Sequence, residues 1–137
     1  MDQLDALFAA AKAAQANAYA PYSKFKVGAA LATPSGAIFA GCNVENAAYP
    51  VGTCAEAGAI AAMVAGGFSR IASILVIGDG PGLVTPCGAC RQRMREFAPP
   101  GLIVHIAGES GPRAQFALDV LLPEAFGPDN LGGASDP

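Results

Sequence analysis

Residues 53–60 read TCAEAGAI and residues 85–92 read TPCGACRQ, and these two stretches decide how the chain must fold. In each stretch a cysteine comes directly before residues that favour a helix. A cysteine at the start of a helix meets exposed backbone N–H groups and the positive end of the helix dipole, and both favour its thiolate. The sequence therefore predicts two helix starts that carry thiolates.

Three cysteines in these stretches have the pattern of a zinc site. Cys87 and Cys90 form a C-x-x-C pair, which by itself fits either a redox dithiol or two metal ligands. Cys54 at the other helix start favours metal, because three thiolates on two helix ends occupy three corners of a tetrahedron and leave the fourth for water. We therefore expect one Zn²⁺ ion per chain.

Glu56 is placed to exchange protons with a water molecule at this fourth corner. It follows Cys54 by two residues and lies in the first helical turn, where its carboxylate can reach past the helix end. Zinc lowers the pKa of a bound water toward about 7, and a nearby carboxylate can take and return the proton. A first-turn glutamate that only stabilises the helix dipole is the simpler interpretation, but the C-x-x-C pair favours catalysis.

Two other interpretations of the cysteines stay open at this point. A structural zinc site needs a fourth protein ligand, and Cys42 and His105 are the remaining candidates. We expect Cys42 to pack as a small hydrophobic residue and His105 to be an ordinary strand residue. A redox-active dithiol without metal is the second alternative.

The rest of the chain reads as alternating helices and strands. Helices are expected at 2–18, 54–67, 87–97 and 115–126, and strands at 25–33, 37–46, 71–79 and 101–107. This order suggests a mixed sheet between layers of helices in a single domain over 1–127, with a loose tail over 128–137.

Composition limits the partners. The net charge is −3 and lysines and arginines form no run, which argues against nucleic acid and for a small, nearly neutral ligand. Hydrophobic residues make up 53% and charged residues 14%, which favours an oligomer over a very well-packed monomer. The acidic N-terminal stretch does not fit a signal peptide and no apolar run reaches membrane-spanning length, so we expect a cytoplasmic protein with reduced thiols.

Four separated motifs resemble the small, homotetrameric, zinc-dependent cytidine deaminases along nearly the whole chain. They are YAPYSKFKVGAAL (19–31), GCNVENAAYPVGTCAE (41–56), PCGACRQ (86–92) and LLPEAFGPDNL (121–131). The resemblance implies a three-layer α/β/α fold with a mixed five-stranded sheet. It also implies hydrolysis of cytidine and 2′-deoxycytidine to the uridines plus ammonia, with another aminopyrimidine nucleoside, such as a nucleoside antibiotic, as the alternative substrate.

The resemblance also implies roles for single residues. Cys54, Cys87 and Cys90 would bind zinc, and Glu56 would carry protons to and from the base. Six residues would contact substrate. Asn43 and Glu45 would bind the ribose, and Phe25 and Ala55 would contact the base. Tyr49 would line the site near the subunit contacts, and Phe126 would reach into the site of a neighbouring subunit.

One position departs from the family pattern. The family commonly has an arginine after the catalytic glutamate, where it hydrogen-bonds the ligand sulfurs, and this chain has Ala57 there. Three thiolates on Zn²⁺ leave a net charge of −1 that must be offset. We expect the helix dipoles and Arg91, which directly follows the C-x-x-C pair, to offset it.

Overall fold

A computed structural model describes residues 2–132, and its centre is one five-stranded sheet. The strands are β1 (Val27–Ala32), β2 (Ile38–Cys42), β3 (Ser73–Gly78), β4 (Ile103–Gly108) and β5 (Gly111–Ala117). Their order across the sheet is β2-β1-β3-β4-β5, and only β3 and β4 run parallel. The expected mixed five-stranded sheet is confirmed.

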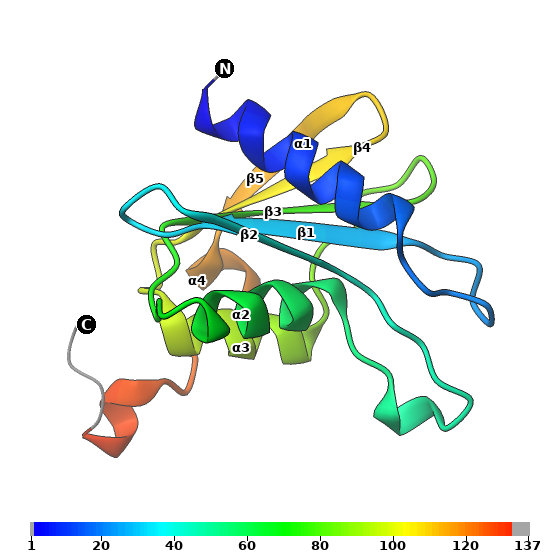
Figure 1. The fold of residues 1–137 in the computed structure, drawn as a ribbon. Coiled ribbons are helices and arrows are strands. Elements are labelled where there is room, and N and C mark those ends of the chain that lie inside the picture. The colour runs from blue at the N-terminus through cyan, green and yellow to red at the C-terminus, as the bar shows by residue number, and fades with distance from the viewer. Residues whose placement is uncertain (1, 133–137) are drawn as a thin grey trace.

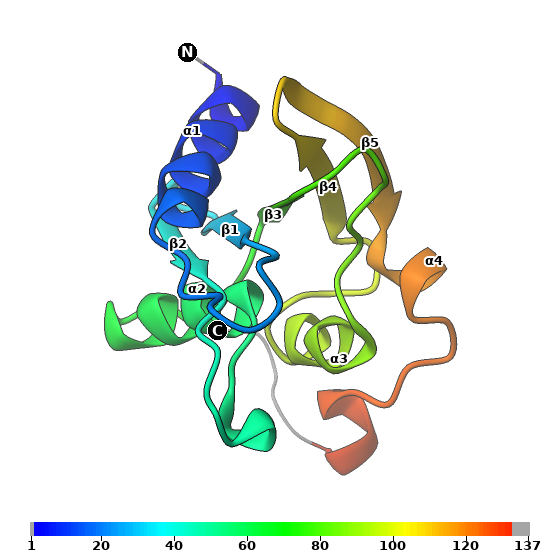
Figure 2. The same cartoon turned by 90° about the vertical axis from the view of Figure 1, so that its right-hand side faces the viewer.

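Helices cover both faces of this sheet. Helix α1 (Gln3–Ala16) lies on one face, while α2 (Ala55–Ala65) and α3 (Gly88–Phe97) lie side by side on the other (Figures 1 and 2). The short helix α4 (Leu118–Leu121) and two 3-10 helices, η1 (Tyr49–Val51) and η2 (Pro128–Leu131), complete the described elements. The chain therefore has the three-layer α/β/α architecture.

Strands β1 and β3 are buried on both faces, which explains their continuous apolar sequences. Alternate residues along each strand point to opposite layers. Leu75 and Ile77 pack with Leu7 of α1, whereas Ile74 and Val76 pack with residues of α2 and α3.

Two glycines let the helices approach the sheet closely. A Cβ atom at Gly28 would lie 2.1 Å from the Ala11 carbonyl oxygen of α1. A Cβ atom at Gly41 would lie 2.5 Å from the Ala59 backbone nitrogen of α2. Because backbone atoms cannot move aside, these positions admit no side chain, and Gly41 seats α2 against β2.

The expected helix over 115–126 is wrong. Residues Gly111–Ala117 form the edge strand β5, which pairs antiparallel with β4. Helix α4 spans only four residues and ends just before Pro123. The apolar residues of this short stretch fit both periodicities, and pairing with β4 places Phe116 against the core.

The other expected elements are confirmed within a few residues. Helix α1 begins behind Asp2, whose carboxylate accepts a 2.9 Å hydrogen bond from the Asp5 N–H. The boundary at residue 127 stays a prediction, since the expected tail includes η2 and its residues 133–137 lie outside the described ones. No helix among residues 2–132 has both the length and the apolar character to cross a membrane.

Candidate active site

The three expected zinc ligands meet where α2 and α3 begin. Cys54 and Cys87 are the N-cap residues of these helices, and Cys90 lies one turn into α3. Their sulfur atoms all lie within 4.8 Å of one another, and the Cys54 and Cys87 sulfurs are 3.8 Å apart. Sulfurs bound to one zinc at about 2.3 Å in a tetrahedron lie about 3.8 Å apart, so this group fits zinc.

The described residues offer this group no fourth ligand. Among residues 2–132, no further histidine, cysteine, aspartate or glutamate joins the three sulfurs. Cys42 lies half-buried at the end of β2 and outside the three-sulfur group, and its packing as a small hydrophobic residue stays a prediction. His105 lies on β4 opposite Gln115, as an ordinary strand residue, and its pKa is lowered by burial. The geometry therefore argues against a closed structural zinc site.

The three thiols differ in how readily they ionise. Burial raises the pKa of Cys54 and Cys90, and for Cys90 the nearby charges of Glu56 and the other two cysteines add to this effect. Burial also opposes ionisation of Cys87, but hydrogen bonds from the Cys90 backbone and side chain and from Cys54 outweigh it and lower the Cys87 pKa. Cys87 is therefore the readiest of the three to become a thiolate, and metal binding has to release protons from its neighbours.

Glu56 lies in the first turn of α2 and is 4% exposed. Burial raises the pKa of its carboxyl group, and this effect outweighs hydrogen bonds from its own backbone N–H and from Cys90 and the attraction of Arg93. A buried carboxyl group beside a metal site can hold a proton at a higher pH than a solvated one.

Glu56, Cys54 and Cys87 line an inner cavity of ≈ 320 Å³, within the size range of small-molecule sites. Its wall is formed by Glu56 and two of the cysteines, by polar residues after β2, and by valines of the sheet and loops. The lining residues are Val27, Asn43, Val44, Glu45, Gly52, Thr53, Cys54, Ala55, Glu56, Val76, Val84, Thr85 and Cys87.

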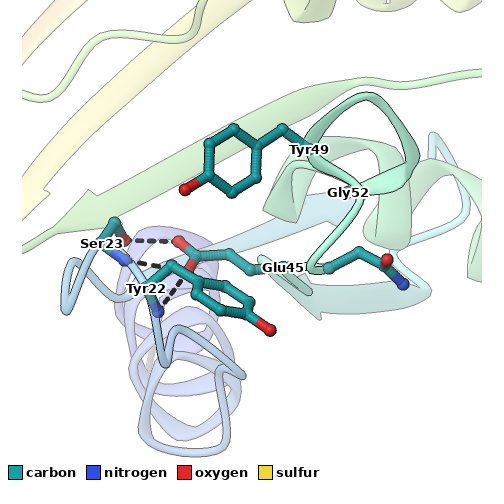
Figure 3. A pocket seen from close by; sticks show the side chains of 6 residues that line it. Tyr22, Ser23, Glu45, Tyr49 and Gly52 are labelled. Atoms are coloured by element: carbon teal, nitrogen blue, oxygen red, sulfur yellow. Dashed lines mark hydrogen bonds between the residues drawn. The ribbon is translucent and has the colours of Figure 1, made fainter.

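An outer cavity of ≈ 380 Å³ adjoins the inner one through Glu45 and Gly52, and is also lined by Tyr22, Ser23, Asn46 and Tyr49 (Figure 3). The Glu45 carboxylate accepts hydrogen bonds from the Ser23 hydroxyl and from the backbone N–H groups of Tyr22 and Ser23. These bonds, led by the Ser23 hydroxyl, lower the Glu45 pKa.

The structure brings only some of the expected substrate residues to these cavities. Asn43, Glu45 and Ala55 line the inner cavity and Tyr49 the outer one. The Asn43 amide also binds the start of β1, because it accepts from the Val27 N–H and donates to the Phe25 carbonyl, both at 2.9 Å.

Phe25 and Phe126 line neither of the two cavities. Phe25 is partly exposed and its N–H donates to the Ser23 hydroxyl oxygen. Phe126 is 57% exposed, and its carbonyl accepts a 2.8 Å hydrogen bond from Gln92 of α3. Their contacts with substrate stay predictions.

The two arginines beside the cysteines differ in what they contact. Arg91 donates to the Pro86 and Leu121 carbonyls, each at 2.7 Å, and to the Thr85 hydroxyl. Arg93 donates to the Cys90 sulfur at 3.2 Å. Sequence reasoning missed Arg93, although its position three residues after Cys90 on one helix was a usable signal. It also missed Ser23, whose role no local pattern reveals.

Comparison with known proteins identifies similar chains. The family model described as "Cytidine and deoxycytidylate deaminase zinc-binding region" matches residues 1–106. The cytidine deaminase of Sporosarcina psychrophila is 40% identical over 97% of this chain and 98% of the relative. The crystal structure of cytidine deaminase from Burkholderia pseudomallei has a TM-score of 0.84 at 48% identity and covers 89% of this chain and 98% of its own. That from Mycobacterium tuberculosis has a TM-score of 0.77 at 36% identity, covering 90% and 96%.

Proposed function

Because this chain belongs to the zinc-binding cytidine and deoxycytidylate deaminase family, we propose that it hydrolyses cytidine and 2′-deoxycytidine to uridine and 2′-deoxyuridine plus ammonia. The observation that carries the proposal is the group of three cysteine sulfurs, two of which line the same cavity of ≈ 320 Å³ as the buried Glu56. The similar proteins of S. psychrophila and B. pseudomallei are named cytidine deaminases.

Cys54, Cys87 and Cys90 would hold zinc, which would supply a Lewis acid able to make water a nucleophile near neutral pH. Glu56 moves the protons. Its carboxylate would take one proton from the water whose oxygen adds to C4 and give it to ring N3, and would then take the remaining hydroxyl proton at C4 and give it to the amino group, which leaves as ammonia. The raised pKa of Glu56 supports this role, because a group that both gives and takes protons works best when its pKa approaches the working pH.

Substrate binding would use the polar wall after β2. Asn43 and Glu45 would hydrogen-bond the ribose hydroxyls, since an amide and an ionised carboxylate both offer acceptors. The Ala55 N–H, at the start of α2, would contact the pyrimidine edge, and Phe25 would pack on its face. Tyr49 would line the site from η1.

Arg91 would support the metal group indirectly. Its hydrogen bonds to Pro86 and Thr85 hold the two residues that lead into Cys87. We therefore expect Arg91→Ala to lower zinc affinity or turnover more than an ordinary surface change, as measured by chelator competition and by the deaminase assay. Zinc content and activity equal to those of the parent would contradict this role.

The assembly would be a homotetramer with sites shared between subunits. Large apolar side chains stay exposed around the cavities, among them Tyr22, Phe25, Val44 and Tyr49, and Phe126 is exposed beside α3. Contact with another subunit would cover such surfaces. Light scattering of the purified protein tests the assembly. A cytoplasmic role in pyrimidine salvage fits the need of zinc thiolates for a reducing compartment.

The proposal is tested by mixing the zinc-loaded protein with cytidine and following the loss of its absorbance band. We expect one zinc per chain, three thiols that resist alkylation while zinc is bound, and deamination that a chelator stops. Turnover of a nucleoside antibiotic but not of cytidine would favour the alternative aminopyrimidine substrate. A zinc-free protein whose cysteines titrate as a disulfide would contradict the proposal.

A further inference from the structure

The charge of the three-cysteine group requires a cation that Ala57 does not supply. Three thiolates on one Zn²⁺ carry a net charge of −1, and hydrogen bonds to the sulfurs tune both metal affinity and the acidity of the site. Residue 57 follows Glu56 on α2 and is uncharged. A side-chain cation that adds to the helix dipoles in offsetting this charge would therefore come from another element.

Arg93 reaches the sulfurs from α3. Its guanidinium nitrogen lies 3.2 Å from the Cys90 sulfur, within hydrogen-bond distance for sulfur. The contact follows from helix geometry, because residues three apart lie on one face of a helix. Arg91, one residue after Cys90, uses its guanidinium on two carbonyls and the Thr85 hydroxyl.

Arg93 and Ala57 also face the same space. Both line a surface groove between α2 and α3, together with Ala61 and Glu96. Arg93 contacts the Cys90 sulfur from the α3 side of this groove, and residue 57 lies three residues after Cys54 on the α2 side.

We infer that Arg93 is the cation that offsets the negative charge of the zinc-thiolate group, in the role that residue 57 leaves unfilled. The inference rests on the proposed zinc site and adds a positioning residue to it. Arg93 acts through the Cys90 sulfur and touches no substrate. Removing its charge should weaken zinc binding and slow turnover without changing the fold, because its side chain is exposed.

The test measures zinc dissociation constants by chelator competition at one pH for the parent, Arg93→Gln and Arg95→Gln. Arg95 is the matched control. It lies on the same helix and loses the same charge, but it contacts the Ala98 carbonyl and Asp129 instead of a sulfur. We expect Arg93→Gln to weaken zinc roughly tenfold or more, the scale for lost partners of metal ligands, and Arg95→Gln to stay close to the parent.

Two further variants separate charge from shape. Arg93→Lys keeps the charge and should retain part of the affinity, and it also serves if Arg93→Gln folds poorly. The double variant Ala57→Arg/Arg93→Gln supplies the charge from the α2 side of the groove and should recover zinc affinity.

Equal zinc affinities in Arg93→Gln and Arg95→Gln would overturn the inference. An Arg93→Lys variant as weak as Arg93→Gln, or a double variant without recovery, would overturn it as well. A parent chain that binds no zinc would instead overturn the proposed function. The two failures are therefore distinguishable.

Discussion

Glu56 and Glu45 line the same inner cavity, and their surroundings move their pKa values in opposite directions. Glu56 is buried at the start of a regular helix, and burial raises its pKa. Glu45 lies in the irregular segment after β2, and hydrogen bonds from Ser23 and Tyr22 lower its pKa. One end of the cavity therefore favours the protonated carboxyl and the other favours the carboxylate.

This difference separates two roles that the sequence alone cannot distinguish. A carboxyl group whose pKa is raised can exchange protons near the working pH, whereas one whose pKa is lowered stays an anion and an acceptor. The metal end of the cavity, at Glu56 and the three-cysteine group, is then expected to govern kcat. The opposite end, at Glu45, is expected to govern KM.

The largest expected effect comes from removing a sulfur at the metal end. Cys90→Ala should lose zinc and reduce deamination to background, because two remaining thiolates do not hold the metal in a defined site. Cys42→Ala is the matched control, since Cys42 lies outside the three-sulfur group. Zinc content by metal analysis and cytidine turnover are the measurements. Full zinc content in Cys90→Ala would show that Cys90 is not needed to bind the metal, and would contradict its assignment as a zinc ligand.

Glu56→Gln tests the proton carrier while nearly preserving its shape. We expect kcat to fall by ~10² or more, the scale of lost acid–base catalysis, with KM little changed. Glu109→Gln, a substitution of an exposed glutamate in the β4–β5 turn, is the control. Steady-state kinetics on cytidine measure both constants. A rise in KM with kcat unchanged would reverse the roles of the two glutamates.

Glu45→Gln should give the opposite pattern at the other end of the cavity. The amide lacks the negative charge of the carboxylate, which we expect to accept hydrogen bonds from the ribose hydroxyls. KM should therefore rise by roughly tenfold, within the range for hydrogen bonds to charged groups. The value of kcat should stay near that of the parent. A nucleoside analogue without the ribose hydroxyls should lose the difference between parent and variant, and an unchanged difference would argue against a ribose contact.

Ser23→Ala should have the smallest effect and tests the cause of the Glu45 pKa. The Ser23 hydroxyl is the leading cause of the lowered value, so its loss should raise the Glu45 pKa toward the ordinary 4.5. As pH falls, the variant should then lose its carboxylate, and its substrate affinity, at a higher pH than the parent. Carbon NMR titration of the Glu45 carboxyl measures the shift. Coincident titration curves would show that the Ser23 hydroxyl is not a cause of the lowered Glu45 pKa.

Much of the metal end could be predicted from sequence because its spacing is local. Cys87 and Cys90 lie one turn apart on a single helix, and the period of that helix places both sulfurs on one side. Cys54 and Glu56 share the first turn of α2 in the same way. The residue pattern predicted four strands and a helix over 115–126. Only the family resemblance predicted a fifth strand.

The contacts of Arg91, Arg93 and Ser23 could not be read in this way. Arg91 and Arg93 are both close to the C-x-x-C pair in sequence, yet only the packing of α3 against Leu121 and the loop at Pro86 decides which carbonyls Arg91 meets. Ser23 and Glu45 come from separate irregular segments, and their meeting depends on how both fold over the end of the sheet.

The amino-acid sequence by itself determined the helix starts, the thiolate pair on α3 and the acid beside Cys54, because a few neighbouring residues with a fixed helical period are enough to place them. Only the tertiary structure decided that the starts of α2 and α3 meet, that Arg93 reaches a sulfur and that Ser23 binds Glu45. These contacts join segments through the packing of whole layers, in which glycines such as Gly41 set how closely a helix approaches the sheet.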